Sequence, residues 1–240
     1  MILETQGIVL HKFRYLEKDF IIHIFTKEKG KLSFLVKNSK RNKSLLAILQ
    51  PMACLQLQFN YREKRDLHYL SEANPVHDLG LDLYMDPVKG ALTFFMAELL
   101  KNSLYPCYPN EDLFLFCSHS GLLLYQANQQ QMAMFPLYYT LMVCSHLGIG
   151  FPDISKAEYF DLLNGTPSSC KPEHKEYICS QELELLKSLL GIDFDALSNS
   201  KASKTVRTTL LRSLLRYLHF QMDHFKGLKS LDILEQLFNH

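Results

Sequence analysis

Seven basic side chains lie within residues 27–43, against a single acid, Glu28. The whole chain carries a formal net charge of only +1, so this local excess stands out. Lysine and arginine bind phosphate oxygens, and a basic loop that leaves a short strand is typical of surfaces that hold a phosphate backbone. Phosphate binding is therefore the first chemistry that the sequence predicts.

The cations that follow the predicted strand 31–36 are the primary candidates for phosphate contacts. Such contacts position a nucleic acid without reading its sequence. They are Lys37, Lys40, Arg41 and Lys43, with the hydroxyls of Ser39 and Ser44 as further donors. Secondary candidates, which could line the same face, are Lys12 and Arg14 together with Arg62, Lys64 and Arg65 at a predicted hairpin tip. The alternative for each cluster is a solvated turn.

Three aromatic residues of the same region, Phe34, Tyr61 and Tyr69, offer stacking surfaces for unpaired bases. In the second half, Arg212 and Arg216 are four residues apart beside an apolar stripe, which would suit an acidic and aromatic tail of a partner. The alternative for this pair is a buried stripe with solvated arginines.

Metal binding and catalysis have weak support. Cys170, His174 and Cys179 fall within ten residues, but the chain has no C-x2-C pair, and a structural zinc site needs four close ligands. No G-x-S-x-G, phosphate-binding P-loop or glycine-rich dinucleotide motif is present. We expect no metal, no cofactor and no enzymatic activity.

The first 75 residues carry strand patterns. Expected strands cover residues 7–13, 19–26, 31–36 and 68–73, and a half-buried strand with alternating polar residues follows Pro51. Five short antiparallel strands predict a small closed barrel of the OB-fold type. A loop is expected at residues 38–43.

Helical spacing begins after Asp86, a predicted cap with Pro87 in the first turn. Further helices are expected at residues 110–128, 132–148, 180–190, 203–225 and 230–238, and residues 148–175 read as an irregular excursion without a zinc finger. The sequence therefore predicts an α+β protein with an OB-fold domain at residues 1–79 and an all-helical domain at residues 80–240.

Charge separates the same two parts. Residues 1–80 hold 13 basic and 8 acidic residues, whereas residues 81–240 hold 13 and 17. Six scattered cysteines favour reduced thiols in a cytoplasmic protein. No membrane span is expected, and the start of the chain does not resemble a signal peptide.

Ordered residues along the chain resemble the RecO family of bacterial recombination mediator proteins. The resemblance rests on Gly7-Ile8-Val9-Leu10, Tyr15-Leu16-Glu17-Lys18-Asp19, Phe25-Thr26, Gly30-Lys31 and the basic run Lys37 to Ser44. It continues through Leu49-Gln50-Pro51, Leu67 and Glu72-Ala73, and near the other end through Leu211-Arg212, Arg216-Tyr217-Leu218, His224 and Leu228-Lys229-Ser230.

The resemblance implies an N-terminal OB-fold, a helical C-terminal domain and a mediator of DNA repair and homologous recombination. It implies binding of single- and double-stranded DNA, annealing of complementary strands, and loading of recombinase onto DNA coated by single-stranded DNA-binding protein. RecR and the C-terminal tail of the coating protein would be partners, and repair would bring the protein to the nucleoid. Many members carry two C-x-x-C pairs. Because Asp153 and Lys156 stand where the first pair would be, the chain is similar to the zinc-less members.

Two other functions stay open at this point. One is an RNA-binding OB-fold protein with a helical interaction domain, which competition between DNA and RNA of one sequence would separate. The other is an enzyme that uses the cysteines and histidine of residues 170–179, which stoichiometric metal in the purified protein would support.

Overall fold

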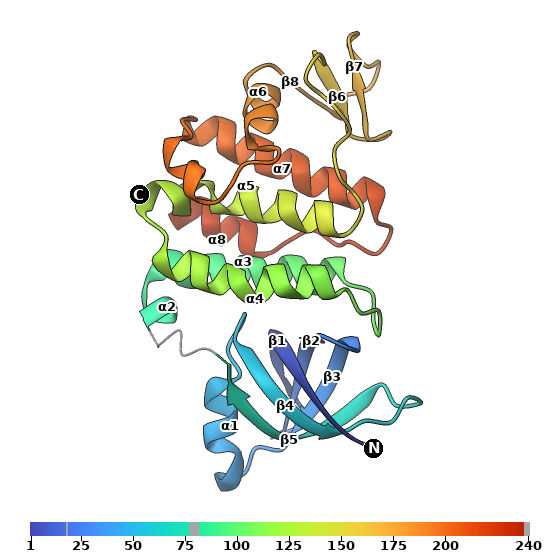
Figure 1. The fold of residues 1–240 in the computed structure, drawn as a ribbon, viewed down its shortest axis with the longest axis vertical. Coiled ribbons are helices and arrows are strands. Elements are labelled where there is room, and N and C mark those ends of the chain that lie inside the picture. Colours follow the sequence, from blue (N-terminus) through green and yellow to red (C-terminus); the bar gives the residue numbers. More distant parts are fainter. Residues whose placement is uncertain (18, 77–81, 238–240) are drawn as a thin grey trace. The chain divides into compact units, whose positions relative to one another are not determined.

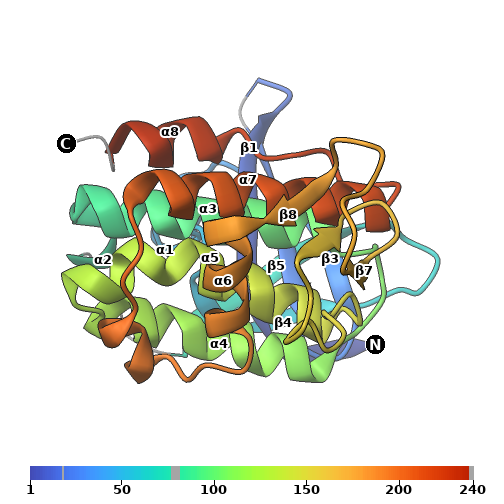
Figure 2. The same cartoon turned by 90° about the horizontal axis from the view of Figure 1, so that it is seen from above.

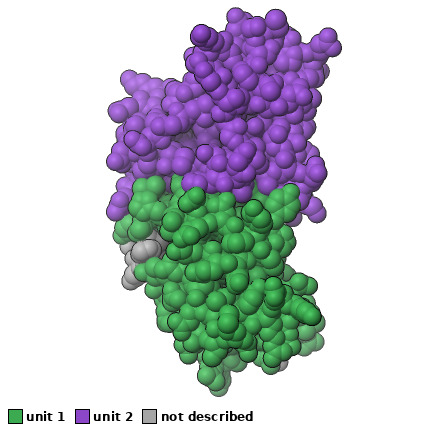
Figure 3. All heavy atoms as spheres, turned by 45° about the vertical axis from the view of Figure 1, so that its right-hand side comes forward, with its two compact units in different colours: residues 1–125 green, residues 126–240 purple. Residues whose placement is uncertain are grey.

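The computed structural model describes residues 1–17, 19–76 and 82–237. The chain divides into two compact units, residues 1–125 and residues 126–240 (Figure 3). The predicted domain boundary at residues 79 and 80 and the last residue of the predicted helix 230–238 lie outside the described residues. The boundary therefore stays a prediction. The first compact unit extends past it, because it includes helices that pack against the barrel.

A closed five-stranded barrel opens the first unit (Figure 1). Its order is β1-β2-β3-β5-β4, in which β3 and β5 are parallel and the other pairs are antiparallel. The strands are β1 (Ile2–Tyr15), β2 (Asp19–Thr26), β3 (Gly30–Val36), β4 (Cys54–Asn60) and β5 (Leu67–Pro75). This is the OB-fold arrangement expected from the sequence.

Alternate side chains of every strand fill the barrel. The interior contains Val9 from β1, Ile22 and Ile24 from β2, aromatic rings from β3 and β4, and Leu70 from β5. Phe34 of β3 is fully buried and meets Phe59 of β4 edge to face, with ring centroids 4.8 Å apart. The prediction that Phe34 offers a stacking surface is therefore wrong, because the strand register turns its ring inward.

The segment between β3 and β4 is partly helical rather than a plain loop. A short 3₁₀ helix, η1 (Lys40–Asn42), leads into α1 (Lys43–Ile48). Leu45, Leu46 and Ile48 of α1 pack against the barrel interior. The sequence-based loop assignment missed this because the six-residue helix gives too little periodic signal.

Three helices complete the first unit: α2 (Asp82–Met85), α3 (Pro87–Ser103) and α4 (Glu111–Gln126). Helix α3 begins as predicted, since Asp86 accepts hydrogen bonds from the backbone N–H groups of Val88 (2.8 Å) and Lys89 (2.9 Å). At the β2–β3 turn Gly30 adopts a φ of +67°, and a Cβ there would overlap the backbone of Tyr108. Glycine thus lets the α3–α4 connection approach the barrel closely.

The second unit is built on α5 (Gln129–His146) and α7 (Lys204–Gln221), which lie side by side (Figures 1 and 2). Helices α6 (Ser180–Leu189) and α8 (Ser230–Leu237) and the 3₁₀ helix η2 (Asp195–Asn199) accompany them. Ser203 caps α7 as predicted, because its hydroxyl accepts from the Val206 N–H at 3.3 Å. Helix α7 ends at Gln221 rather than 225, where Met222 turns to an extended backbone.

A three-stranded antiparallel sheet has two strands within the predicted irregular excursion, residues 148–175, and its third strand just after it. Its strands, β6 (Tyr159–Asp161), β7 (Thr166–Ser168) and β8 (Tyr177–Cys179), have the order β7-β6-β8. Three-residue strands are too short to show alternation, so no strand was predicted there. Phe160 attaches this sheet to α7, with its ring centroid 5.5 Å from that of Tyr217.

Across residues 1–17, 19–76 and 82–237, no helix is both long enough and apolar enough to cross a membrane.

Candidate nucleic-acid interface

The basic segment, defined here as residues 37–43, lies on the surface at one end of the barrel. Its four cations, Lys37, Lys40, Arg41 and Lys43, are all exposed. Two hydrogen bonds fix the backbone under them. The Asn42 side-chain amide donates to the Lys37 carbonyl oxygen at 2.8 Å, and the Asn38 N–H donates to Asp19 Oδ1 at 3.3 Å. A held backbone that carries exposed cations suits phosphate oxygens.

Ser39 precedes η1 with an extended backbone, and its side chain makes no capping bond to the helix. Ser39 is exposed, like the four cations around it, and Ser44 is exposed as well. Ser39 within the segment and Ser44 just after it therefore lie beside the predicted phosphate contacts.

Lys12 and Arg14 occupy different surroundings. Arg14 is exposed, and it is the register partner of Phe20, which in turn pairs with Val36, so it lies at the same barrel end as the basic segment. Lys12 is half-buried, and its Nζ donates to the Leu46 carbonyl oxygen of α1 at 3.1 Å. Burial lowers the pKa of Lys12. Through this hydrogen bond Lys12 links β1 to α1, the helix that follows the basic segment.

The β4–β5 loop, residues 61–66, carries the exposed cations Arg62, Lys64 and Arg65. The ladder places this loop beside the N-terminal end of β1, because Ile2 pairs with Asn60. The basic segment lies instead beside the C-terminal end of β1. The two clusters therefore sit at opposite ends of the barrel, and the expectation that Arg62, Lys64 and Arg65 line one face with Lys12 and Arg14 is corrected by the register.

The other three cations of residues 27–43 have structural contacts within the first unit. Lys27 Nζ lies 3.1 Å from Glu111 Oε1, and Lys29 Nζ lies 5.0 Å from the ring centroid of Tyr61. Lys31 Nζ donates to the Lys101 carbonyl oxygen at 2.9 Å. Most of the free positive charge therefore belongs to the basic segment, not to the turn that precedes β3.

Helices cover part of the outer barrel surface. Phe25 of β2 is fully buried against Phe114 of α4, with ring centroids 5.5 Å apart. On the same outer face His11 and His23 lie 6.3 Å apart between ring centroids, near Lys101 of α3. Burial, then His11, Lys101 and Lys31, lower the pKa of His23 to about 4. Helices α3 and α4 therefore leave little of this part of the outer face exposed.

The predicted partner site on α7 includes an arginine that is already ion-paired, in contrast to the exposed cations of the basic segment. Arg216 pairs through Nη2 with Glu176 Oε2, and its side chain remains about half exposed. Arg212, one turn earlier, also points away from the buried stripe, since it is exposed while Leu211 and Leu215 are buried. An acidic ligand at Arg216 would have to compete with Glu176.

His174, the histidine of the candidate metal cluster at residues 170–179, takes part in a hydrogen-bond network. Its Nδ1 accepts from the Glu176 N–H at 3.1 Å, so Nε2 carries the proton and donates to Asp161 Oδ2 at 3.2 Å. Both ring nitrogens are thus occupied. Among the described residues, no group of three or more histidine, cysteine or acidic side chains is arranged to hold a metal ion.

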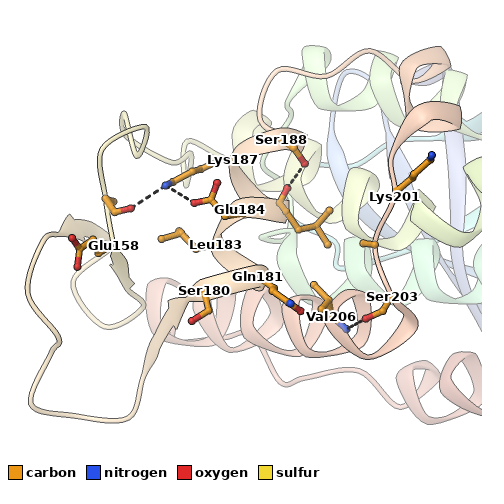
Figure 4. Close-up of a pocket in the computed structure, with 13 residues that line it drawn as sticks. Glu158, Ser180, Gln181, Leu183, Glu184, Lys187, Ser188, Lys201, Ser203 and Val206 are labelled. Atoms are coloured by element: carbon orange, nitrogen blue, oxygen red, sulfur yellow. Dashed lines mark hydrogen bonds and ion pairs between the residues drawn. The ribbon is translucent and has the colours of Figure 1, made fainter.

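A cavity of about 1020 Å³ lies beside α6 in the second unit (Figure 4). Lys187 occupies one wall, where its Nζ pairs with Glu184 at 2.8 Å and donates to the Ala157 carbonyl oxygen at 3.0 Å. On the other wall the Ser203 hydroxyl is used by the cap of α7. Both side chains are therefore engaged in hydrogen bonds within the protein.

Comparisons with known proteins match this architecture in two parts. The model for the N-terminal part of recombination protein O matches residues 1–79, and the model for the C-terminal part of that protein matches residues 85–232. Together they cover most of the chain.

The chain belongs to the recombination protein O family. DNA repair protein RecO of Bacteroides fragilis is 30% identical over 244 residues, which cover all of both chains. DNA repair protein RecO of Flavobacterium psychrophilum is 30% identical over 248 residues, again with full coverage of both. Membership confirms the resemblance seen in the sequence and gives this RecO-family chain a role in DNA repair and recombination.

Sequence reasoning missed two features of this RecO-family chain. One is the helical cover on the outer barrel face, whose only sequence signal is that Phe25 is too apolar for an open strand face. The other is the hydrogen-bond network of Asp161 and His174, which no sequence motif predicts. Both depend on residues that are distant in the sequence.

Proposed function

We propose that this protein binds single- and double-stranded DNA, anneals complementary strands and helps to load recombinase onto DNA coated by single-stranded DNA-binding protein. The observation that carries the proposal is the exposed basic segment at one end of an OB-fold barrel. Family membership in recombination protein O agrees with it.

Annealing requires phosphate neutralisation and accessible base edges. Lysine and arginine contacts to phosphates release counterions and reduce repulsion between two strands, whereas they leave the base edges free to pair. Lys37, Lys40, Arg41 and Lys43 supply such contacts in the proposal, with Ser39 as a neutral donor. This chemistry needs no general acid, nucleophile or metal, so we propose a mediator without enzymatic activity that works in the cytoplasm at the nucleoid.

We propose that the protein partners bind to the second unit. RecR and the C-terminal tail of the coating protein are the proposed partners, and α7 is the proposed tail site. Arg212 and Arg216 there would receive the acidic groups of the tail, and one turn of helix separates them. The ion pair of Arg216 with Glu176 keeps the guanidinium in place before a tail arrives.

Annealing of coated strands tests the proposal. Complementary oligonucleotides coated by single-stranded DNA-binding protein are mixed with and without this chain, and duplex formation is followed by a fluorescence-quenching pair. We expect duplex to form faster with the chain, and less so as salt is raised. Equal rates with and without the chain would contradict the annealing function. RNA strands of the same sequence, coated in the same way, form the matched arm for the RNA-binding alternative.

A further inference from the structure

Strands β3 and β5 are the one parallel pair of the barrel, with Ser33 opposite Leu67 and Leu35 opposite Tyr69. Because the two strands run in the same direction, the segment after β3 and the loop before β5 lie at opposite ends of the pair. The basic segment starts two residues beyond Leu35, and Arg65 lies four residues before Tyr69. At about 3.3 Å per residue, roughly 20 Å of strand separates the two basic clusters.

Tyr69 lies on the outer barrel surface between these clusters. Its neighbours His68 and Leu70 are buried, at 2% and 8% exposure, so the alternation of the strand turns Tyr69 outward. Tyr69 itself is 55% exposed. Its cross-strand partner Leu35 is 9% exposed, which gives the ring an apolar neighbour while one face stays open.

Helices cover one other part of the outer surface. Helices α3 and α4 cover the part of β2 around His23 and Phe25, whereas Tyr69 on β5 is open. Cations beyond both ends of the β3–β5 pair, with an exposed aromatic ring on β5 between them, form the pattern of a single-strand track: phosphates are held electrostatically and a base stacks on the ring. The flanking positive charge favours a nucleic acid over an apolar protein surface here.

We propose that a single strand of DNA lies along the open outer face of β5, with phosphates at the basic segment and at the β4–β5 loop, and with an unpaired base stacked on Tyr69. This inference rests on the proposed DNA-binding function and adds the path of the strand and the position of Tyr69 on that path. Duplex DNA presents phosphates but no free base face, so Tyr69 distinguishes single strands from duplexes. The separated clusters then act together on one strand, although they lie at opposite ends of the barrel.

The test compares Tyr69→Thr with Tyr69→Phe, because threonine keeps the β propensity of the strand and phenylalanine keeps the ring. Tyr125→Ala, which removes another half-exposed tyrosine of the first unit, is the matched control. Binding to fluorescein-labelled oligothymidine and to a duplex of the same length is measured by fluorescence anisotropy. We expect Tyr69→Thr to weaken oligothymidine binding about tenfold, the scale of one stacked base, and to leave duplex binding unchanged.

Tyr69→Phe and Tyr125→Ala are expected to bind both DNAs like the unaltered protein. An oligonucleotide without bases at its central positions should bind the Tyr69→Thr variant and the unaltered protein equally. Equal oligothymidine affinity of Tyr69→Thr and the unaltered protein would overturn the stacking role and leave Tyr69 as a protein contact. The proposed DNA-binding function fails separately, if the unaltered protein binds neither DNA.

Discussion

Lys31 of strand β3 donates a hydrogen bond from Nζ to the Lys101 carbonyl oxygen of helix α3 at 2.9 Å, and a second to the Leu104 carbonyl oxygen. The last carbonyl groups of a helix have no partner within the helix, and a cation at that end also favours the helix dipole. Lys31 therefore joins the barrel to α3. Its place in the basic run is structural, although its charge looks like part of the phosphate-binding group.

Replacing Lys31 is expected to destabilise the first unit. Lys31→Met keeps the length and apolar stem of the side chain but leaves the Lys101 and Leu104 carbonyl oxygens without their donor. We expect a loss of about 1 to 2 kcal/mol in the free energy of unfolding, the range for a charge-assisted hydrogen bond that is partly exposed. Urea unfolding followed by circular dichroism measures it. Lys29→Met, which loses only a contact with Tyr61, should cost less; an equal cost would contradict the capping role.

Acid is expected to destabilise the first unit through His23. Its pKa in the folded protein is about 4, against 6.5 for the free side chain, because burial and the neighbouring His11, Lys101 and Lys31 disfavour the imidazolium. The unfolded chain therefore binds more protons between these values, so stability is full above pH 6.5 and falls as the pH drops towards 4. After allowance for solvent screening at a half-buried ring, the loss is about 1 to 2 kcal/mol.

The measurement is urea unfolding at several pH values. His23→Gln should give a flatter dependence between pH 6.5 and 4, because glutamine does not titrate. His119→Gln, which removes an exposed histidine of α4, is the matched control and should keep the slope. A His23→Gln slope equal to that of the unaltered protein would disprove the assignment.

The double substitution Lys40→Ala with Arg41→Ala is expected to weaken DNA binding. If each side chain neutralises one phosphate, the slope of log affinity against log salt concentration should fall by about 1.4 for single-stranded DNA. Titrations at four salt concentrations measure both quantities. Lys175→Ala with Lys226→Ala removes the same charge from exposed positions of the second unit and is the control. The same loss in both double variants would point to net charge rather than to this segment.

Asp161 is expected to support the small sheet of the second unit. Burial raises the pKa of its carboxyl group, but hydrogen bonds from Asn164, His174 and Leu163 outweigh this and lower it. Asp161→Asn keeps the shape and removes the charge, and we expect a loss of about 1 to 3 kcal/mol. Since the folded pKa is depressed, this contribution is present above the unfolded pKa of 3.8 and is lost as the pH falls further.

Hydrogen exchange of the β6 and β8 amides reports on that sheet directly. Faster exchange in Asp161→Asn, with unchanged exchange in the barrel, is the expected result. Asp153→Asn is the control, because Asp153 bonds only locally to the Ser155 N–H and is exposed. Unchanged exchange of β6 and β8 in the Asp161 variant would remove the supporting role.

Local signals were sufficient for much of the fold. The alternation in residues 19–26 and 31–36 predicted β2 and β3 nearly to the residue, and Asp86 with Pro87 predicted the start of α3, because caps and periodicity act between near neighbours. The three-residue strands of the small sheet escaped prediction because three residues are too few to show alternation. The inward direction of Phe34 escaped it as well, because register depends on the whole barrel.

The amino-acid sequence by itself determined the class of fold, the family resemblance and the concentration of positive charge in residues 27–43, since these depend on residue types and short spacings. The tertiary structure decided which of those cations are free. Lys31 bonds to the end of α3, whereas Lys37, Lys40, Arg41 and Lys43 remain exposed. The parallel pairing of β3 with β5 also decided that Tyr69 lies between two basic clusters. The physical reason is that a strand's pairing partner and open face depend on neighbours that are remote along the chain.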